Sequence, residues 1–305
     1  MLENTKNTDS HIKRQFVTHR KVRSLLGWLN HDEAIRLLLG HDPAPGEDLV
    51  HVEKLYAQQR KAVASRMQPS ISTSIVESVT TDWNLEVRAQ DATLRSALAG
   101  LDWSLQIVDL RRVIAYQKMV TIDGLDERIA PAQADSTQLL ELCLPREQAE
   151  PPKNLLRDAD QKGFTISSLN PNLRIAGNQV KTVQVAPEEG MQPTSMLAVT
   201  FLISMGTSYL KVASYKDRDF LREGYHRAAA LLRAGIYEIP CVYIKARSLE
   251  DLGGNRETTL HYDILFGDRP PLLDDFWNDN VSAVVDQQVF RKAIRVTAEE
   301  FEIQG

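Results

Sequence analysis

Hydrophobic residues in the first part of the chain recur at three- and four-residue spacing. The run VRSLLGWLNHDEAIRLLLG lies within residues 13–40, and Gly40 with Pro43 close behind forms a stop signal. This pattern predicts an α-helix over residues 13–40. The same kind of spacing predicts helices over residues 49–67 and 93–100.

Three other stretches of the first half predict strands. Residues 103–120 have the pattern of a strand that runs into an amphipathic helix, and residues 73–79 and 83–87 have that of strands or edge segments. Because most of the periodic residues are helical in spacing, we expect the first half of the chain to be mostly helical.

The pattern changes to alternating and continuous apolar runs after about residue 180. The expected elements are, in order, strands over residues 181–186 and 198–205, a hairpin over 208–224 with Lys216-Asp217-Arg218 at its turn, a helix over 226–234 that stops at Gly235, and a buried strand over 239–246. A strand, a hairpin, a helix and a strand in this order predict a compact α/β unit with a small mixed sheet.

A charged segment with three prolines, CLPREQAEPPKN over residues 143–154, separates the two patterns. Prolines and charges of this density are typical of a linker. We therefore expect an α+β protein with two domains. Residues 1–145 would form a mostly helical region for recognition or assembly, and residues 151–305 an α/β domain with an acidic C-terminal extension.

Composition limits the class of protein. With 305 residues, 43% hydrophobic and 25% charged, the chain can build an ordinary core. Its polar start has no apolar stretch typical of a secretory signal, and the longest apolar run, MLAVTFLI, is too short to cross a bilayer. The two cysteines, Cys143 and Cys241, match neither a disulfide framework nor a zinc motif, and the histidines show no metal-ligand spacing. We expect a cytoplasmic protein with reduced thiols, no metal site and no membrane partner.

The stretch REGYHRAAALLRAGIYEIP, residues 222–240, carries the candidate chemistry. Gly224 would let the chain turn from strand into helix, and the free amides of the first helical turn suit a phosphate. Arg227 could bind that phosphate with two hydrogen bonds, and His226 could donate a further one or act as an acid or base. Glu223 could hold a ribose hydroxyl, a metal ion or a substrate proton. The alternative is a structural turn whose Arg227 pairs with a neighbouring carboxylate.

The sequence EGYHRAAALLRAGIYEIPCVYI resembles the core of the ParB/sulfiredoxin-like superfamily. Members carry a box of the D-G-x-H-R type after a hairpin, then an Ala-rich helix, a Gly and a strand that begins with Pro. The resemblance covers about residues 179–245. It implies that a nucleotide, ATP or CTP with or without Mg²⁺, binds through Gly224, Tyr225, His226 and Arg227. Members of the superfamily include CTP-binding partition proteins, ATP-using sulfiredoxins and nucleotide-dependent free-serine kinases.

The box departs from the family pattern in three respects. Sulfiredoxins have their catalytic Cys where this chain has Tyr225, which argues against their chemistry. The usual Asp is replaced by Glu223, whose longer side chain would shift a metal or ribose contact. No helix-turn-helix pattern follows the box. The segment over residues 261–280 is acidic instead, which argues against a role in chromosome segregation.

Three functional hypotheses follow. The first is a nucleotide- or phosphate-binding regulatory or interaction protein, with a protein partner or self-association through the first half. The second is a phosphotransferase or nucleotide hydrolase that uses Glu223 or His226 as acid or base. The third is a DNA- or RNA-binding protein in which a basic helix over residues 13–23 contacts the nucleic acid. The basic residues of that helix are Lys13, Arg14, Arg20, Lys21 and Arg23. The net charge of −5 makes this third hypothesis the least favoured.

Overall fold

The chain mixes helices with several small sheets, which confirms the α+β class. The computed structural model describes residues 19–69, 73–77, 83–125, 135–146, 155–157, 163–168, 173–185, 194–205, 208–253, 258–289 and 292–303. No helix among these residues is long and apolar enough to cross a membrane.

The chain divides into two compact units, but not at the expected linker alone. The larger unit combines residues 18–146 with 208–289, and the smaller one combines residues 1–17, 147–207 and 290–305. The chain thus leaves the larger unit after residue 146 and returns at residue 208. The expected division into 1–145 and 151–305 does not describe this arrangement, because strands from both halves pair in one sheet.

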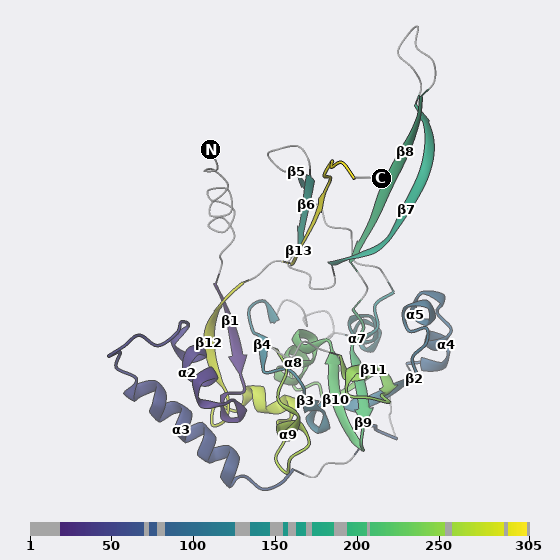
Figure 1. The fold of residues 1–305 in the computed structure, drawn as a ribbon. Helices are drawn as coiled ribbons and strands as arrows, with labels where there is room; N and C mark the ends of the chain where they lie inside the picture. The colour runs from purple at the N-terminus through teal and green to yellow at the C-terminus, as the bar shows by residue number, and fades with distance from the viewer. Residues whose placement is uncertain are drawn as a thin grey trace. The chain divides into compact units, whose positions relative to one another are not determined.

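That shared sheet has five strands in the order β2-β11-β9-β10-β3 (Figure 1). Its strands are β2 (Trp103–Asp109), β3 (Ile114–Ala115), β9 (Lys211–Tyr215), β10 (Arg218–Glu223) and β11 (Glu238–Lys245). β11 runs parallel to β9, and β10 runs parallel to β3, while the other neighbours are antiparallel. The small mixed sheet is therefore present, with two of its strands supplied by the first half of the chain.

Both faces of this sheet are covered. The six central residues of β11 are all buried, and successive side chains of a strand point to opposite faces. α8 (Tyr225–Arg233) contributes Ala228, Ala229 and Ala230 to the core, each at most 3% exposed. These small side chains let the helix backbone come close to its neighbours. The expected hairpin, Ala-rich helix and buried strand are all present, which confirms this part of the prediction.

Among the described residues of the larger unit, α3 (Val50–Ser65) is the longest helix and the others have nine residues or fewer. Besides α8, these others are α2 (His31–Leu39), α4 (Leu85–Ala89), α5 (Ala92–Ala97), α7 (Ser136–Cys143), α9 (Tyr262–Leu265) and the 3-10 turns η1 (Leu26–Trp28), η2 (Leu110–Arg112), η3 (Glu250–Leu252) and η4 (Leu273–Trp277). The helices expected over residues 49–67 and 93–100 are confirmed as α3 and α5.

The helix expected over residues 13–40 is wrong in its described part, apart from α2. Residues 19–24 form β1 (His19–Ser24), the middle strand of a sheet with β4 (Met119–Thr121) and β12 (Ala283–Gln288). Val22 and Ser24 are buried, whereas Lys21 is exposed, so burial here has the two-residue period of a strand. Beyond Ser24 the chain is buried at every position to Leu29, which removes any helical period.

Two other expectations need correction. The amphipathic helix expected after β2 is replaced by η2, β3 and β4. Four consecutive residues, Val113 to Tyr116, are buried there, and such a run cannot show an amphipathic period. The strand expected over residues 83–87 is replaced by α4, which is too short for spacing to distinguish helix from strand.

The smaller unit consists of β-structure in its described part. It contains a three-stranded sheet, β13-β6-β5, and a two-stranded ribbon, β7-β8. These strands are β5 (Leu155–Arg157), β6 (Gly163–Ser168), β7 (Leu173–Val185), β8 (Thr194–Met205) and β13 (Lys292–Thr297). The expected strands over residues 181–186 and 198–205 lie in the ribbon, which is longer than the sequence pattern indicated.

Candidate functional site

The candidate site lies where β10 ends and α8 begins. The turn between β9 and β10 places Lys216 and Asp217 in the left-handed region, at φ 52° and 57°. Gly224 follows β10 at φ 96° and begins the helix. A Cβ on Gly224 would lie 3.1 Å from Cγ and 3.2 Å from Cα of Leu210. Both its φ and its surroundings therefore require glycine at this junction.

α8 begins at Gly224, which has no side chain that could cap the positive end of the helix. The first bond of the helix runs from the amide of Ala228 to the carbonyl of Gly224, at 2.9 Å. The first turn contains no acidic residue, and its N-cap residue is a glycine. Three other helices of the same unit differ, because Asn30, Asp91 and Asp135 cap α2, α5 and α7. The amides of residues 225–227 are thus the free N–H donors of the first turn of α8, and this turn contains no acidic residue.

Arg227 lies beside this turn and also holds the fold together. Its Nη1 donates to the carbonyl of Leu142 at 2.7 Å, and its Nη2 donates to Oγ of Ser208 at 3.1 Å. Nη2 is also 3.4 Å from the position of a Cβ on Gly224. The guanidinium therefore adds positive charge at the turn while it fastens the end of α7 to the start of the hairpin.

Glu223 forms an ion pair with Lys211. Nζ of Lys211 lies 3.0 Å from Oε2 of Glu223, and the two side chains are 13% and 37% exposed. The two residues face each other across β9 and β10, next to a register shift. The carboxylate expected to hold a ribose hydroxyl, a metal ion or a proton is thus partly accessible, with a cation at one of its oxygens.

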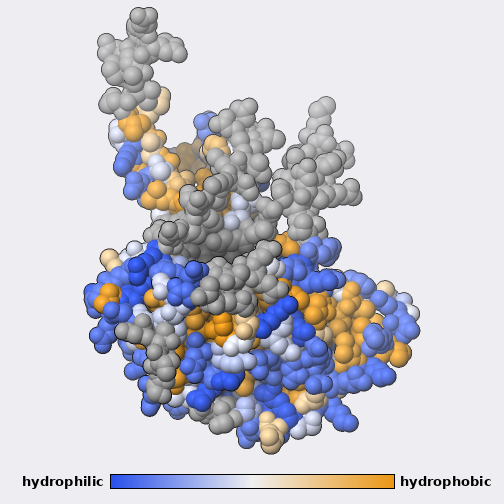
Figure 2. All heavy atoms as spheres, turned by 180° about the vertical axis from the view of Figure 1, so that it is seen from behind, coloured by the Kyte–Doolittle hydropathy of each residue, from blue (hydrophilic) through white to orange (hydrophobic). Residues whose placement is uncertain are grey.

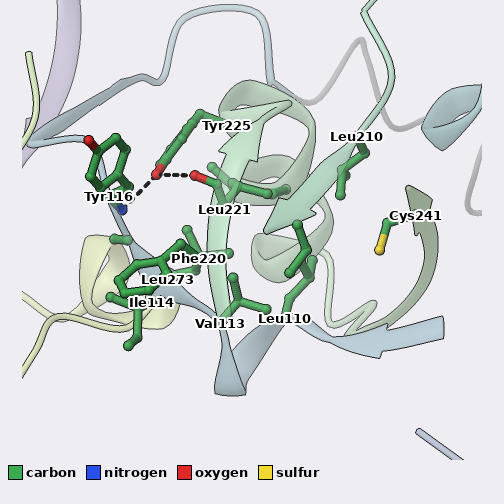
Figure 3. Close-up of a cluster of buried hydrophobic side chains, with 14 of the residues drawn as sticks. Leu110, Val113, Ile114, Tyr116, Leu210, Phe220, Leu221, Tyr225, Cys241 and Leu273 are labelled. Carbon is green, nitrogen blue, oxygen red and sulfur yellow. Dashed lines mark hydrogen bonds between the residues drawn. The ribbon is translucent and has the colours of Figure 1, made fainter. Parts of the chain in front are cut away.

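Tyr225 has a structural side chain. Its hydroxyl donates to the carbonyl of Leu221 at 2.7 Å and accepts from the amides of Tyr116 and Gln117 at 2.7 and 2.9 Å. Figure 3 shows the ring inserted between β10 and the chain at Tyr116. Burial raises the pKa of this phenol well above its usual value, against the opposing effect of the two amide donors. The side chain expected at the phosphate site is therefore engaged in the core, which leaves the backbone amide of Tyr225 for a ligand.

Arg222 is a cation that the sequence did not single out. Within the described residues, its Nη1 is buried and has no hydrogen-bond partner. Its Nε lies 3.1 Å from the position of a Cβ on Gly253, which follows η3. The charge of Arg222 also contributes to a lowered pKa of Asp251, after the amide hydrogen bonds from Arg247 and Ser248. The sequence draws attention to Arg222 only through its position directly before Glu223 and Gly224. The alternation of side chains along a strand does not predict that part of its guanidinium is buried.

The other residues of the box add little metal-binding capacity. His226 is half-buried in the first turn of α8. No group of three or more His, Cys, Asp or Glu residues that could hold a metal ion occurs in the part of the chain that the structure describes. Glu223 is the carboxylate of the box, and Mg²⁺ can bind through one protein carboxylate together with phosphate oxygens of a nucleotide.

The basic segment over residues 13–23 does not form the expected helix in its described part. Arg23, on β1, donates to the carbonyl of Phe276 and to Asp279, and its side chain is 14% exposed. Arg20 and Lys21 alternate along the same strand, so they point to opposite faces. Lys13 and Arg14 lie outside the described residues. Arg20, Lys21 and Arg23 are therefore not gathered on one helical face for nucleic acid.

Comparison of the chain with protein-family models, with curated proteins and with solved structures finds no match. The resemblance of residues 179–245 to the ParB/sulfiredoxin-like superfamily stays a prediction. Within that range the structure contains the hairpin, the left-handed Gly224, the helix α8 and the buried strand β11 in the order of the motif.

Proposed function

We propose that this protein binds a phosphate-bearing ligand, a nucleotide such as ATP or CTP, at the turn formed by residues 224–227. The observation that carries the proposal is the positive end of α8, which begins at a glycine, has no acidic residue in its first turn and contains Arg227 there. An acidic or hydroxyl cap is usual at such an end and favours the helix. Replacement of that cap by Gly, followed by His226 and Arg227, favours an anion supplied by a ligand.

The residues present fit a phosphate group. The amides of residues 225–227 would donate to its oxygens, and Arg227 would contribute charge from its position beside Gly224. Arg222 directly precedes this box, but its guanidinium lies against Gly253, so we do not include it among the donors for the phosphate. Such a site suits a regulatory protein that senses a nucleotide in the cytoplasm.

No observation on the described residues favours the two alternatives. A phosphotransferase or hydrolase would need Glu223 or His226 directed at a substrate, and Glu223 is paired with Lys211. A nucleic-acid protein would need its cations on one face, whereas Arg23 is engaged within the fold. Both stay predictions. Should turnover be found, Glu223→Gln would lower it about 10²–10⁴-fold with binding retained if the carboxylate is a general base.

The sharpest test places an acid at the end of α8. His226→Glu adds a negative charge at the second helical position, which favours the helix by about 0.3–1 kcal/mol but repels an anion. We expect unchanged or higher thermal stability and at least about tenfold weaker binding. Calorimetric titration with inorganic phosphate, ATP and CTP, with and without Mg²⁺, would measure the binding.

His51→Glu is the matched control, because His51 is exposed and occupies the second position of α3. His51→Glu makes the same change of charge at the same position of a helix as His226→Glu does. It should leave ligand binding intact. Arg227→Ala is a poorer test, since it also removes the contacts with Leu142 and Ser208. The proposal fails if none of these ligands binds the wild-type chain, or if His226→Glu binds them as tightly as His51→Glu does.

A further inference from the structure

The two faces of the ribbon β7-β8 differ in charge, although exposed apolar side chains lie on both, with Val183, Met196 and Leu202 on the face that carries the cations. In an antiparallel pair, residues directly opposite each other point to the same side. Val180 pairs with Val199, and Thr182 pairs with Leu197, so these four share one face. Lys181 pairs with Ala198 and lies on the other face, as does Arg174 by its register. The two cations of the ribbon are therefore on the same side.

The face opposite the cations is apolar and exposed. We call it the apolar face, and its large side chains are Ile175 at 50% exposure, Val180 at 58%, Leu197 at 69%, Val199 at 55% and Phe201 at 41%. Among its described residues there is no charged side chain. Figure 2 shows hydrophobic side chains along the arm that the ribbon forms. Several large apolar side chains exposed on one face mark an interaction site.

A two-stranded ribbon also needs a packing partner for its own stability. An isolated hairpin is marginal in water unless a further strand or helix covers its hydrophobic face. The side chains of the apolar face remain about half exposed within the chain. The missing cover must therefore come from outside the described fold.

We propose that the apolar face docks on the same face of a second copy of this chain. A face without charge offers no group that would select an oppositely charged partner, but it is complementary to itself across a two-fold axis. Two such ribbons would pack face to face about 10 Å apart, as two sheets do. The cations Lys181 and Arg174 would then point away from the interface into solvent.

The area supports this choice of partner. Five half-exposed apolar side chains offer roughly 500 Å² per copy, so two copies bury about 1,000 Å² from these residues alone, which reaches the area that specific interfaces need. Polar residues on the same face, Asn178 opposite Phe201 and Thr182 opposite Leu197, would add to that area. The interface is therefore large enough for a dimer and small enough to be reversible.

Sedimentation velocity of the full chain from about 1 to 100 µM would test this proposal. We expect the mass of two copies for the wild type. Leu197→Lys should raise the dissociation constant roughly 100-fold, because a two-fold interface contains each substitution twice. Met196→Lys is the matched control. Met196 directly precedes Leu197 in β8, is 51% exposed and points to the opposite face.

The outcomes separate the possible partners. The proposal holds if the wild type and Met196→Lys sediment as dimers while Leu197→Lys sediments as a monomer with unchanged circular dichroism. It is overturned if the wild type stays monomeric throughout, including the case in which it binds phosphatidylcholine vesicles instead. It is also overturned if both variants stay dimeric. Should Leu197→Lys fail to fold, wild-type hydrogen exchange decides, because the amides of β8 must exchange more slowly as protein concentration rises.

Discussion

The hairpin β9-β10 and the ribbon β7-β8 are both antiparallel pairs with Val and Leu side chains, and they have opposite surroundings. Val212 and Leu221 of the hairpin are fully buried, whereas Val180 and Val199 of the ribbon are more than half exposed. The hairpin has β11 and β3 as further neighbours, while the ribbon has only its own two strands in its sheet. Apolar strand patterns therefore predict that a hairpin forms, but they do not predict what covers it.

Thiol reactivity should separate the two regions by the widest margin. Cys143 and Cys241 are fully buried, and burial raises the pKa of Cys143 to about 12 and that of Cys241 well above its usual value. A Met196→Cys variant places a thiol on the exposed ribbon. We expect a maleimide to label this thiol at least about 10³-fold faster than the two native ones, which react only after opening of the fold.

Stopped labelling followed by mass spectrometry would measure the three rates. Immediate reaction of either native thiol would show that the core around β11 is not closed.

Matched leucine truncations should show the next largest contrast. Leu221→Ala in β10 removes a fully buried side chain and should lower the free energy of unfolding by about 2–5 kcal/mol. Leu202→Ala in β8 removes a side chain that is 45% exposed and should cost less than about 1 kcal/mol. Denaturant unfolding monitored by circular dichroism gives both values, and equal losses would contradict the burial difference.

The tyrosine that closes the core should have an intermediate effect. Tyr225→Phe leaves the amides of Tyr116 and Gln117 and the carbonyl of Leu221 without their partner. We expect a loss of about 1–3 kcal/mol in the free energy of unfolding. Thr200→Val, at an exposed position of the ribbon, is the control and should be nearly neutral. An unchanged midpoint for Tyr225→Phe would mean that the three buried groups find other partners.

Two glycines should change the free energy of unfolding in opposite directions. Gly224→Ala forces a side chain into the left-handed region against Leu210 and should cost about 1–3 kcal/mol. Gly177→Ala in β7 meets no atom within 4 Å, and it should be neutral or stabilising by about 0.4–1 kcal/mol through the unfolded chain. Thermal melts of both variants would reveal the signs, and a destabilised Gly177→Ala would place unrecognised strain at the bulge of the ribbon.

The candidate site was largely predictable because its signals are local. Lys216-Asp217 at the turn, Gly224 before the helix and Gly235 after it each occupy a left-handed position, and such positions favour particular residues. The sequence could not predict the contacts that these side chains make. Arg227 bonds to Leu142 and Glu223 pairs with Lys211 only in the folded chain. The burial of Arg222 also depends on the fold.

The first half was predicted less well for a physical reason. Leu25, Leu26, Trp28 and Leu29 are all nearly fully buried, so their spacing reflects burial on every side rather than a helical face. β3 has only two residues and β4 has three, and strands so short show no alternation. β3 is placed by pairing with β10 and β4 by pairing with β1, and both partners lie far away in the sequence.

The strand order of the five-stranded sheet also bears on how the chain is made. β2 lies at one edge with β11 as its neighbour, and β11 is completed only at Lys245. At roughly 5–20 residues per second, β2 leaves the ribosome on the order of ten seconds before that strand exists. Throughout this interval the apolar residues of β2 and the backbone groups that later bond to β11 are open to other chains. The nascent chain that has not yet reached β11 is therefore the stage of synthesis most in need of a chaperone.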